Sequence, residues 1–144
     1  MDISSLYDLS GLPKFSSSGE GNLTHLDLKF LACEVISLFK ERGYKGTVQV
    51  DFNRHFLERA NHPRNGTPVT RIELQNLFQK VFITYSESII CLGCDAQIVL
   101  FDSATLINVP FVIRLNREEN WIEFILKTVL RKRDFKTSDR VFTV

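Results

Sequence analysis

The amino-acid sequence predicts an α+β fold in which N-terminal helices pack on a three- to four-stranded antiparallel sheet. Apolar residues recur with helical spacing through the first half of the chain, and past Tyr85 they alternate with a period of two. With 144 residues, 44% apolar and 24% charged, the chain is long enough for one globular core without disulfides. Helices first and consecutive strands afterwards are typical of an α+β domain.

Residues 1–23 are predicted to form a flexible N-terminal arm, and residues 24–144 a single α+β domain. The arm contains Gly-Leu-Pro and a Ser/Gly-rich run from Phe15 to Asn22, which is typical of flexible segments. Its spaced apolar residues, Leu6, Leu9 and Leu12 with Phe15, can dock on the body or on a neighbouring subunit. Oligomerisation through the arm is therefore one expectation.

The first helix is expected over residues 24–42. Thr24 can cap it with Asp27 three residues on, and Gly43 supplies the stop. Residues 47–50 then form a short strand or a connector.

Asp51 offers an N-cap for a short helix over residues 52–61, and residues 64–68 form a turn. The sequence Thr70-Arg71-Ile72-Glu73 is a capping box, which opens a third helix. The period-two pattern predicts three consecutive strands and a short terminal one: residues 96–101, 108–115, 121–132 and 140–144.

Charge is unevenly distributed along the chain. The net charge is only +1, yet residues 127–144 contain six basic and two acidic residues, a net of +4. Such a basic end attracts polyanions. The sequence has no run of 18 apolar residues, so no membrane span is expected. The first residues lack the basic start of a secretory signal. The odd number of cysteines, three, indicates a reducing compartment.

The first candidate cluster surrounds His55. On the predicted helix His55 and Arg59 lie four residues apart, so their side chains would lie one above the other at the edge of the core, with Arg64 following on the turn. Partial burial at that edge can shift the pKa of a histidine, and it strengthens the electrostatic interactions of an arginine. The alternative is a structural or merely solvated His-Arg pair.

The second cluster lies on the predicted strand over residues 121–132. Strand alternation places Lys127 and Arg131 on one face, as in a phosphate-gripping pair, with Lys132 beside them. Thr128 points away from that pair unless a bulge intervenes. The alternative is a solvated basic edge strand, in which lysines discourage edge pairing.

Other chemistries find little support. The single CxxC of Cys91 and Cys94 has no second ligand pair for zinc and no βαβ context for a redox site, so buried free thiols are expected. Carboxylates are scattered and no Gly-rich phosphate loop is present, so neither a metal nor another cofactor is expected.

Residues 51–59 (DFNRHFLER) with 64–66 (RNG), 108–112 (NVPFV) and 127–132 (KTVLRK) resemble a motif in small, mostly uncharacterised bacteriophage proteins. These are similar in turn to phage-borne relatives of the barnase, EndoU, colicin and RelE ribonuclease fold (BECR). The resemblance covers residues 50–142. It implies a phage-encoded, metal-independent endoribonuclease, which drives the RNA 2′-OH onto its own phosphate to leave a 2′,3′-cyclic end.

On that resemblance His55 is the acid/base group. Arg59 belongs with it in the catalytic set, with Lys127 and Thr128, while Arg64, Arg131 and Lys132 bind the substrate phosphate. The expected partner is RNA, and the expected location is the cytoplasm of the infected host. A second acid/base partner is not evident in the sequence.

The alternative is a non-catalytic phage protein, either a virion component or a binder of nucleic acid or of a host protein. Catalysis requires His55, Arg59, Arg64 and Lys127 to converge within about one phosphate's width. A nucleic-acid binder needs only basic residues along a surface, and its affinity falls steeply with salt.

Overall fold

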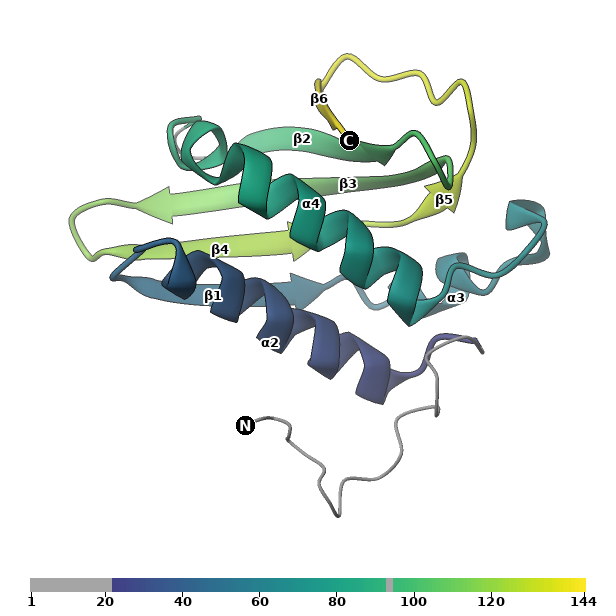
Figure 1. Cartoon of the computed structure of the whole chain (residues 1–144), viewed down its shortest axis with the longest axis horizontal. Coiled ribbons are helices and arrows are strands. Elements are labelled where there is room, and N and C mark those ends of the chain that lie inside the picture. The colour runs from purple at the N-terminus through teal and green to yellow at the C-terminus, as the bar shows by residue number, and fades with distance from the viewer. Residues whose placement is uncertain (1–21, 93–94) are drawn as a thin grey trace.

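A computed structural model describes residues 22–92 and 95–144 of the chain. Two long helices, α2 (His25–Glu41) and α4 (Arg71–Ile90), lie side by side on one face of a mixed sheet (Figure 1). The α+β class is confirmed. The sheet is not purely antiparallel, however, and the helices are not all N-terminal, because β1 (Thr47–Phe52) lies between α2 and the short α3 (Phe56–Ala60).

The predicted first helix is confirmed together with its caps. The Thr24 hydroxyl accepts a hydrogen bond from the Asp27 backbone N–H at 3.2 Å, and the Asp27 carboxylate accepts one from the Thr24 N–H at 2.9 Å. Gly43, at φ 95°, follows the last turn in the left-handed region that glycine adopts without strain. Leu23, in the predicted arm, is already buried, while residues 1–21 lie outside the described part of the chain.

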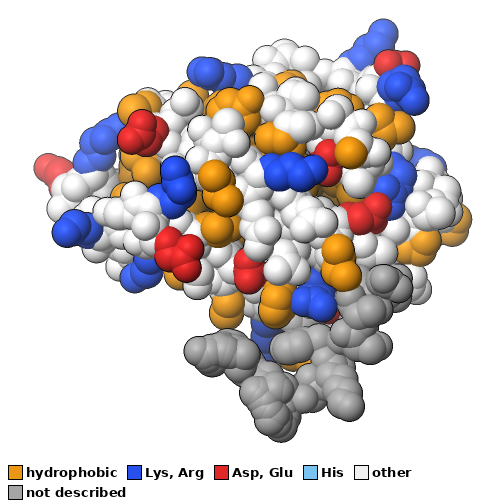
Figure 2. All heavy atoms as spheres, in the orientation of Figure 1, with side chains coloured by type: hydrophobic (Ala, Val, Ile, Leu, Met, Phe, Trp, Pro, Cys, Tyr) orange, Lys and Arg blue, Asp and Glu red, His pale blue; other side chains and the backbone are white. Residues whose placement is uncertain are grey.

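The third predicted helix is α4, which begins at the expected capping box. The Thr70 hydroxyl accepts from the Glu73 N–H, and the Glu73 carboxylate accepts from the Thr70 N–H. Aromatic rings from both helices and the sheet meet in the core, where the Phe39 and Phe124 ring centroids are 5.0 Å apart. Figure 2 shows acidic and basic side chains interspersed over the outer surface of the two helices.

The strand order is β1-β4-β3-β2-β6, with β2 at Ala96–Asp102, β3 at Ile107–Asn116, β4 at Trp121–Leu126 and β6 at Arg140–Thr143. The predicted β2-β3-β4 meander is antiparallel, as expected. The prediction of three to four antiparallel strands is wrong in two respects. The described residues form a six-stranded sheet, and at its edges β1 pairs with β4 and β6 with β2 in parallel. Strand periodicity reveals the strands, but only the path of the crossovers decides their direction.

The short helix begins later than predicted. Asp51 and Phe52 belong to β1, so Asp51 is not the N-cap, and His55 takes the cap position of α3. The Asn53 N–H still bonds the Leu126 carbonyl at 2.9 Å, which continues the pairing with β4 past the end of β1. The Phe52 ring packs on Phe56 with centroids 4.9 Å apart. The extended chain is therefore stabilised by the sheet just where local capping signals favour a helix.

The predicted strand over residues 121–132 is interrupted by a bulge. Between the pair Phe111–Leu126 and the pair Asn108–Leu130, β3 advances three residues while its partner advances four. β5 (Leu130–Arg131) resumes the pairing one residue out of step. The simple alternation predicted for this strand is therefore wrong beyond Leu126: Val129 turns into the core.

Asp51 on β1 and Glu123 on β4 form a carboxyl pair on the sheet face opposite the helices. The hydrogen bond with Asp51, partial burial and repulsion by the Asp51 charge raise the pKa of Glu123, and the Arg114 charge opposes them. A folded-state pKa above the unfolded value favours folding at low pH, and this contribution is lost as the pH rises through the folded-state pKa.

Glu123→Gln is therefore expected to raise the free energy of unfolding at pH 7, by less than about 1 kcal/mol, because it removes the repulsion at a partly exposed site. Urea denaturation at pH 7 and at pH 4 checks this, with the exposed Glu118→Gln as the control. The gain should shrink at pH 4. A loss of stability at pH 7 would contradict the assignment.

Candidate functional site

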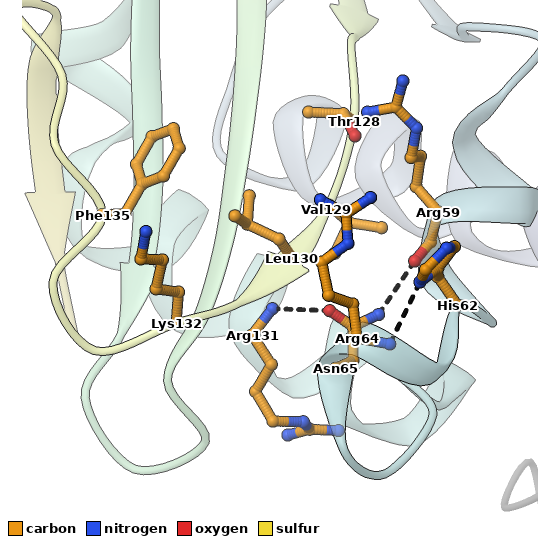
Figure 3. Close-up of a pocket in the computed structure, with 10 residues that line it drawn as sticks. All are labelled: Arg59, His62, Arg64, Asn65, Thr128, Val129, Leu130, Arg131, Lys132 and Phe135. Atoms are coloured by element: carbon orange, nitrogen blue, oxygen red, sulfur yellow. Dashed lines mark hydrogen bonds between the residues drawn. The ribbon is translucent and has the colours of Figure 1, made fainter.

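A cavity of about 450 Å³ lies where α3 and the 3-10 helix η1 (Pro63–Asn65) face β5 and the segment that follows it. Figure 3 shows the side chains from both walls around this space. Of the four segments that resemble the phage-protein motif, three contribute residues to the cavity: 51–59, 64–66 and 127–132. The lining residues are Arg59, His62, Arg64, Asn65, Thr128, Val129, Leu130, Arg131, Lys132 and Phe135.

The first wall is shaped by the turn at His62. His62 is extended, Pro63 begins η1, and the His62 Nδ1 atom accepts a hydrogen bond from the Arg64 backbone N–H at 3.0 Å. Because Nδ1 accepts, the neutral ring carries its proton on Nε2, so Nε2 is a hydrogen-bond donor in this conformation. Gly66 follows at φ 77°, a backbone conformation that favours glycine.

The second wall is β5 with the next residue, Lys132, which is fixed by β3 and the loop before β3. The Lys132 N–H donates to the Leu106 carbonyl at 2.9 Å, and the buried Asn108 amide donates to the Lys132 carbonyl at 2.8 Å. The Lys132 backbone is therefore held from both sides, while its side chain stays exposed. The bulge turns Thr128 and Leu130 toward the cavity, where both contribute to its lining.

Asn65 joins the two walls. Its buried amide group donates to the carbonyls of Arg59 (2.8 Å) and Ala60 (3.1 Å), and its Oδ1 atom accepts from the Arg131 backbone N–H at 2.9 Å. From the last residue of η1, this one side chain thus holds the end of α3 against β5. The spacing of the walls depends on these three hydrogen bonds.

Arg131 lines the cavity, but its guanidinium is committed elsewhere. It donates to both carboxylate oxygens of Glu73, at 3.0 and 3.1 Å, and to the carbonyls of Pro68 (2.9 Å) and Thr105 (3.0 Å). Burial tends to raise the pKa of Glu73, but the hydrogen bonds from Arg131 and Thr70 and the Arg131 charge outweigh it and hold that pKa below its ordinary value. Arg131 is thus built into the framework of the site.

His55 and Lys127 are not among the residues that line the cavity. The prediction that His55 lies above Arg59 on a helix is wrong, because His55 precedes α3. The His55 ring contacts Glu58 at 3.2 Å and accepts a hydrogen bond from Arg54 Nε at 3.2 Å. The Lys127 Nζ atom donates to Gln97 at 3.4 Å. The predicted shared face of Lys127 and Arg131 is also wrong, because the bulge directs Lys127 toward β2 and Arg131 toward α4.

The residues that the structure does bring together are Arg59, Arg64, Thr128 and Lys132, with Arg131 behind them. The sequence did not identify His62 as a cavity residue, although it lies between the predicted site residues Arg59 and Arg64. It also missed the amides of Asn65 and Asn108 and the ring of Phe135. The Asn-Gly turn at residues 65–66 was the one available signal, since it marks where the chain reverses beside α3.

The cavity is electrostatically positive. No carboxylate is among its lining residues, and within residues 22–92 and 95–144 no acidic group forms a salt bridge with Arg59, Arg64 or Lys132. All three side chains are exposed. The arrangement suits an anion with several acceptor oxygens, such as a phosphate group.

Among the described residues, no group of three His, Cys, Asp or Glu side chains is placed to hold a metal ion. Cys91 is a free thiol at the end of α4 and is exposed, which corrects the expectation of a buried thiol, and Cys94 lies outside the described residues. No described helix is both long and apolar enough to span a membrane.

Comparison of the chain with protein-family models, with curated proteins and with solved structures finds no match in any of the three. A functional assignment therefore depends on the geometry of this basic cavity.

Proposed function

We propose that the domain binds RNA through the basic cavity, as an endoribonuclease-like protein that needs no metal ion. The observation that carries the proposal is the convergence of Arg59, Arg64 and Lys132 on one concave site with no carboxylate in its lining. Three cationic side chains around a cavity match the charge and the oxygen-rich surface of a phosphate backbone. Arg133 and Lys136, on the segment after β5, are also basic and exposed, with one acidic residue, Asp134, between them.

Each lining residue has a distinct part in this proposal. Arg64 and Arg59 offer planar guanidinium groups to phosphate oxygens from one wall, and Lys132 offers a compact charge from the other. The His62 Nε2–H and the Thr128 hydroxyl are neutral donors for the remaining oxygens. Arg131 contributes indirectly, because its bonds to Glu73 and to backbone carbonyls hold β5 in place.

RNA cleavage is the second candidate. In that reaction the 2′-oxygen attacks phosphorus, the 5′-oxygen leaves, and a proton moves from the first to the second. Arg59, Arg64 and Lys132 would stabilise the charge on the phosphorane. His62, in place of His55, would be the acid/base group, but Nε2 accepts a proton only after the ring changes tautomer, which puts the proton on Nδ1 and breaks the bond from the Arg64 N–H. Binding needs no such change, and for this reason it is the first candidate.

Arg64→Gln with Lys132→Gln is expected to weaken binding of a labelled single-stranded RNA roughly tenfold or more. The plot of log affinity against log salt should also become shallower by about 1.4, which corresponds to two lost phosphate contacts on a single strand. Fluorescence anisotropy in EDTA at several salt concentrations measures both quantities. The backbone bond from Arg64 to His62 is retained in the variant.

The matched control is Lys40→Gln with Lys45→Gln, which removes the same charge from exposed positions at the end of α2 and before β1 begins, whereas the cavity lies beyond the end of β1. If the two double variants lose affinity equally, the RNA is not held in the cavity and the proposal fails. Gel analysis of the same RNA in EDTA tests the second candidate. Cleavage that leaves cyclic-phosphate ends and is lost in His62→Ala but kept in His55→Ala and Lys127→Ala would establish it in this cavity.

A further inference from the structure

We propose that the cavity takes one unpaired nucleotide, with its base against Phe135 and Leu130 and its phosphate on the surrounding cations. The inference rests on the proposed RNA binding and names the class of RNA: single strands and unpaired loop nucleotides, in preference to duplex. It follows from the apolar part of the same lining, which phosphate binding alone does not use.

The apolar side chains lie on the β5 wall, next to a cation. Phe135 and Leu130 are half-buried, Val129 is buried, and all three line the cavity. Figure 3 shows Phe135 beside Lys132 on one side of the space, with Arg59 and His62 across from them. A nucleotide has the same division, with an aromatic base at one end and an anionic phosphate at the other. An aromatic ring next to a cation is the usual platform of proteins that bind single strands.

The size of the cavity limits what can enter it. Its volume of about 450 Å³ lies at the lower end of the range for sites that enclose small molecules, about 300–1,000 Å³. One nucleotide fits such a space, whereas a base pair with both of its backbones does not. In duplex RNA the faces of the bases are stacked on each other, so they are not available to the Phe135 ring. The cavity therefore selects for an unpaired base.

The ring and the cation are placed together by the fold. Lys132 is fixed through its backbone by Leu106 and Asn108, and Phe135 follows three residues later on the same segment. Across the cavity, Asn65 holds the end of α3 against β5. The distance between the two walls is thus set by the buried Asn65 amide, and a base between the walls finds a site that is already formed.

The test compares three RNAs of equal phosphate number: a single strand, a hairpin with an unpaired loop and a blunt duplex. Anisotropy is expected to give clearly tighter binding for the first two. Phe135→Ala should weaken binding of the single strand by roughly fivefold to a hundredfold, the loss of one stacked base, and leave duplex binding unchanged. Phe135→Tyr, which keeps the ring, should bind as the wild type does.

A 2-aminopurine placed in the single strand supplies a spectroscopic check. Its fluorescence should change on binding to wild type and to Phe135→Tyr, and not on saturation of Phe135→Ala. Suppose that the double variant Arg64→Gln with Lys132→Gln still weakens binding, so that the proposed function holds. The inference is then overturned if duplex binds as tightly as the single strand, or if Phe135→Ala binds the single strand as tightly as the wild type does. If no RNA binds to the wild-type protein, the proposed function itself fails, and the two failures are thereby distinguished.

Discussion

Asn65→Asp is expected to lower the free energy of unfolding at pH 7 by about 3 kcal/mol, one of the two largest effects anticipated for a single substitution in this domain. The aspartate keeps the shape and the oxygen that accepts from the Arg131 N–H. It loses the two donors to the Arg59 and Ala60 carbonyls and places a negative charge against both carbonyl oxygens. The site is buried, so water compensates little of this cost.

Urea denaturation followed by circular dichroism measures the loss. Asn76→Asp makes the same chemical change at an exposed position of α4, and it should alter stability by less than about 0.5 kcal/mol. Acidification should restore part of the stability of Asn65→Asp, since a protonated carboxyl can donate one of the two missing hydrogen bonds. Equal stabilities of the two variants at pH 7 would show that Asn65 does not join the walls.

Arg131→Met is the second large effect, with an expected loss of about 3 kcal/mol at pH 7. The Arg131 and Glu73 side chains are only 15% and 28% exposed, so methionine leaves a partly buried carboxylate without its partner. It also removes the donors to the Pro68 and Thr105 carbonyls. The turn before α4 and the loop before β3 should therefore loosen together.

The pH dependence of this loss follows from Glu73. Its pKa in the folded protein lies below the ordinary value of 4.5, so its ion pair stabilises the fold above that value. The stabilisation disappears as the pH falls through the folded-state pKa. The deficit of Arg131→Met should accordingly shrink in denaturation experiments below pH 4, without reaching zero, because the bonds to the carbonyls do not titrate.

Arg133→Met, two residues away and exposed, is the matched control and should cost less than about 0.5 kcal/mol. Arg131→Met together with Glu73→Gln tests the pairing directly, because removal of both charges should restore part of the loss. A deficit that stayed constant from pH 7 to pH 3 would contradict a stabilising role for the ion pair.

The elements that could be predicted from the sequence are those whose signals are local. Both long helices begin at capping boxes, at Thr24 and Thr70, and Gly43 marks the end of the first. The meander follows from alternation within each strand. The parallel edge strands could not be predicted, because β1 and β6 find their partners through crossovers, and no local pattern encodes which strand lies next to which.

The candidate site was predictable to a similar degree. The basic composition of two segments pointed to Arg59, Arg64 and Lys132, which the cavity does collect. The prediction that His55 and Lys127 lie in the site was wrong for two reasons, neither of which is local in the sequence. Pairing with β4 keeps residues 51–52 extended and so delays the start of α3, while a one-residue bulge after Leu126 redirects everything that follows.

The pairing of β1 with β4 also determines when the domain can fold. As the chain emerges from a ribosome, β1 appears early, but the strand beside which it must lie is made only after α3, α4, β2 and β3. Until then α2 has no completed sheet to cover, and its apolar face remains in water. Assembly governed by such distant contacts is slow, and the interval leaves a hydrophobic surface open to chaperones and to aggregation.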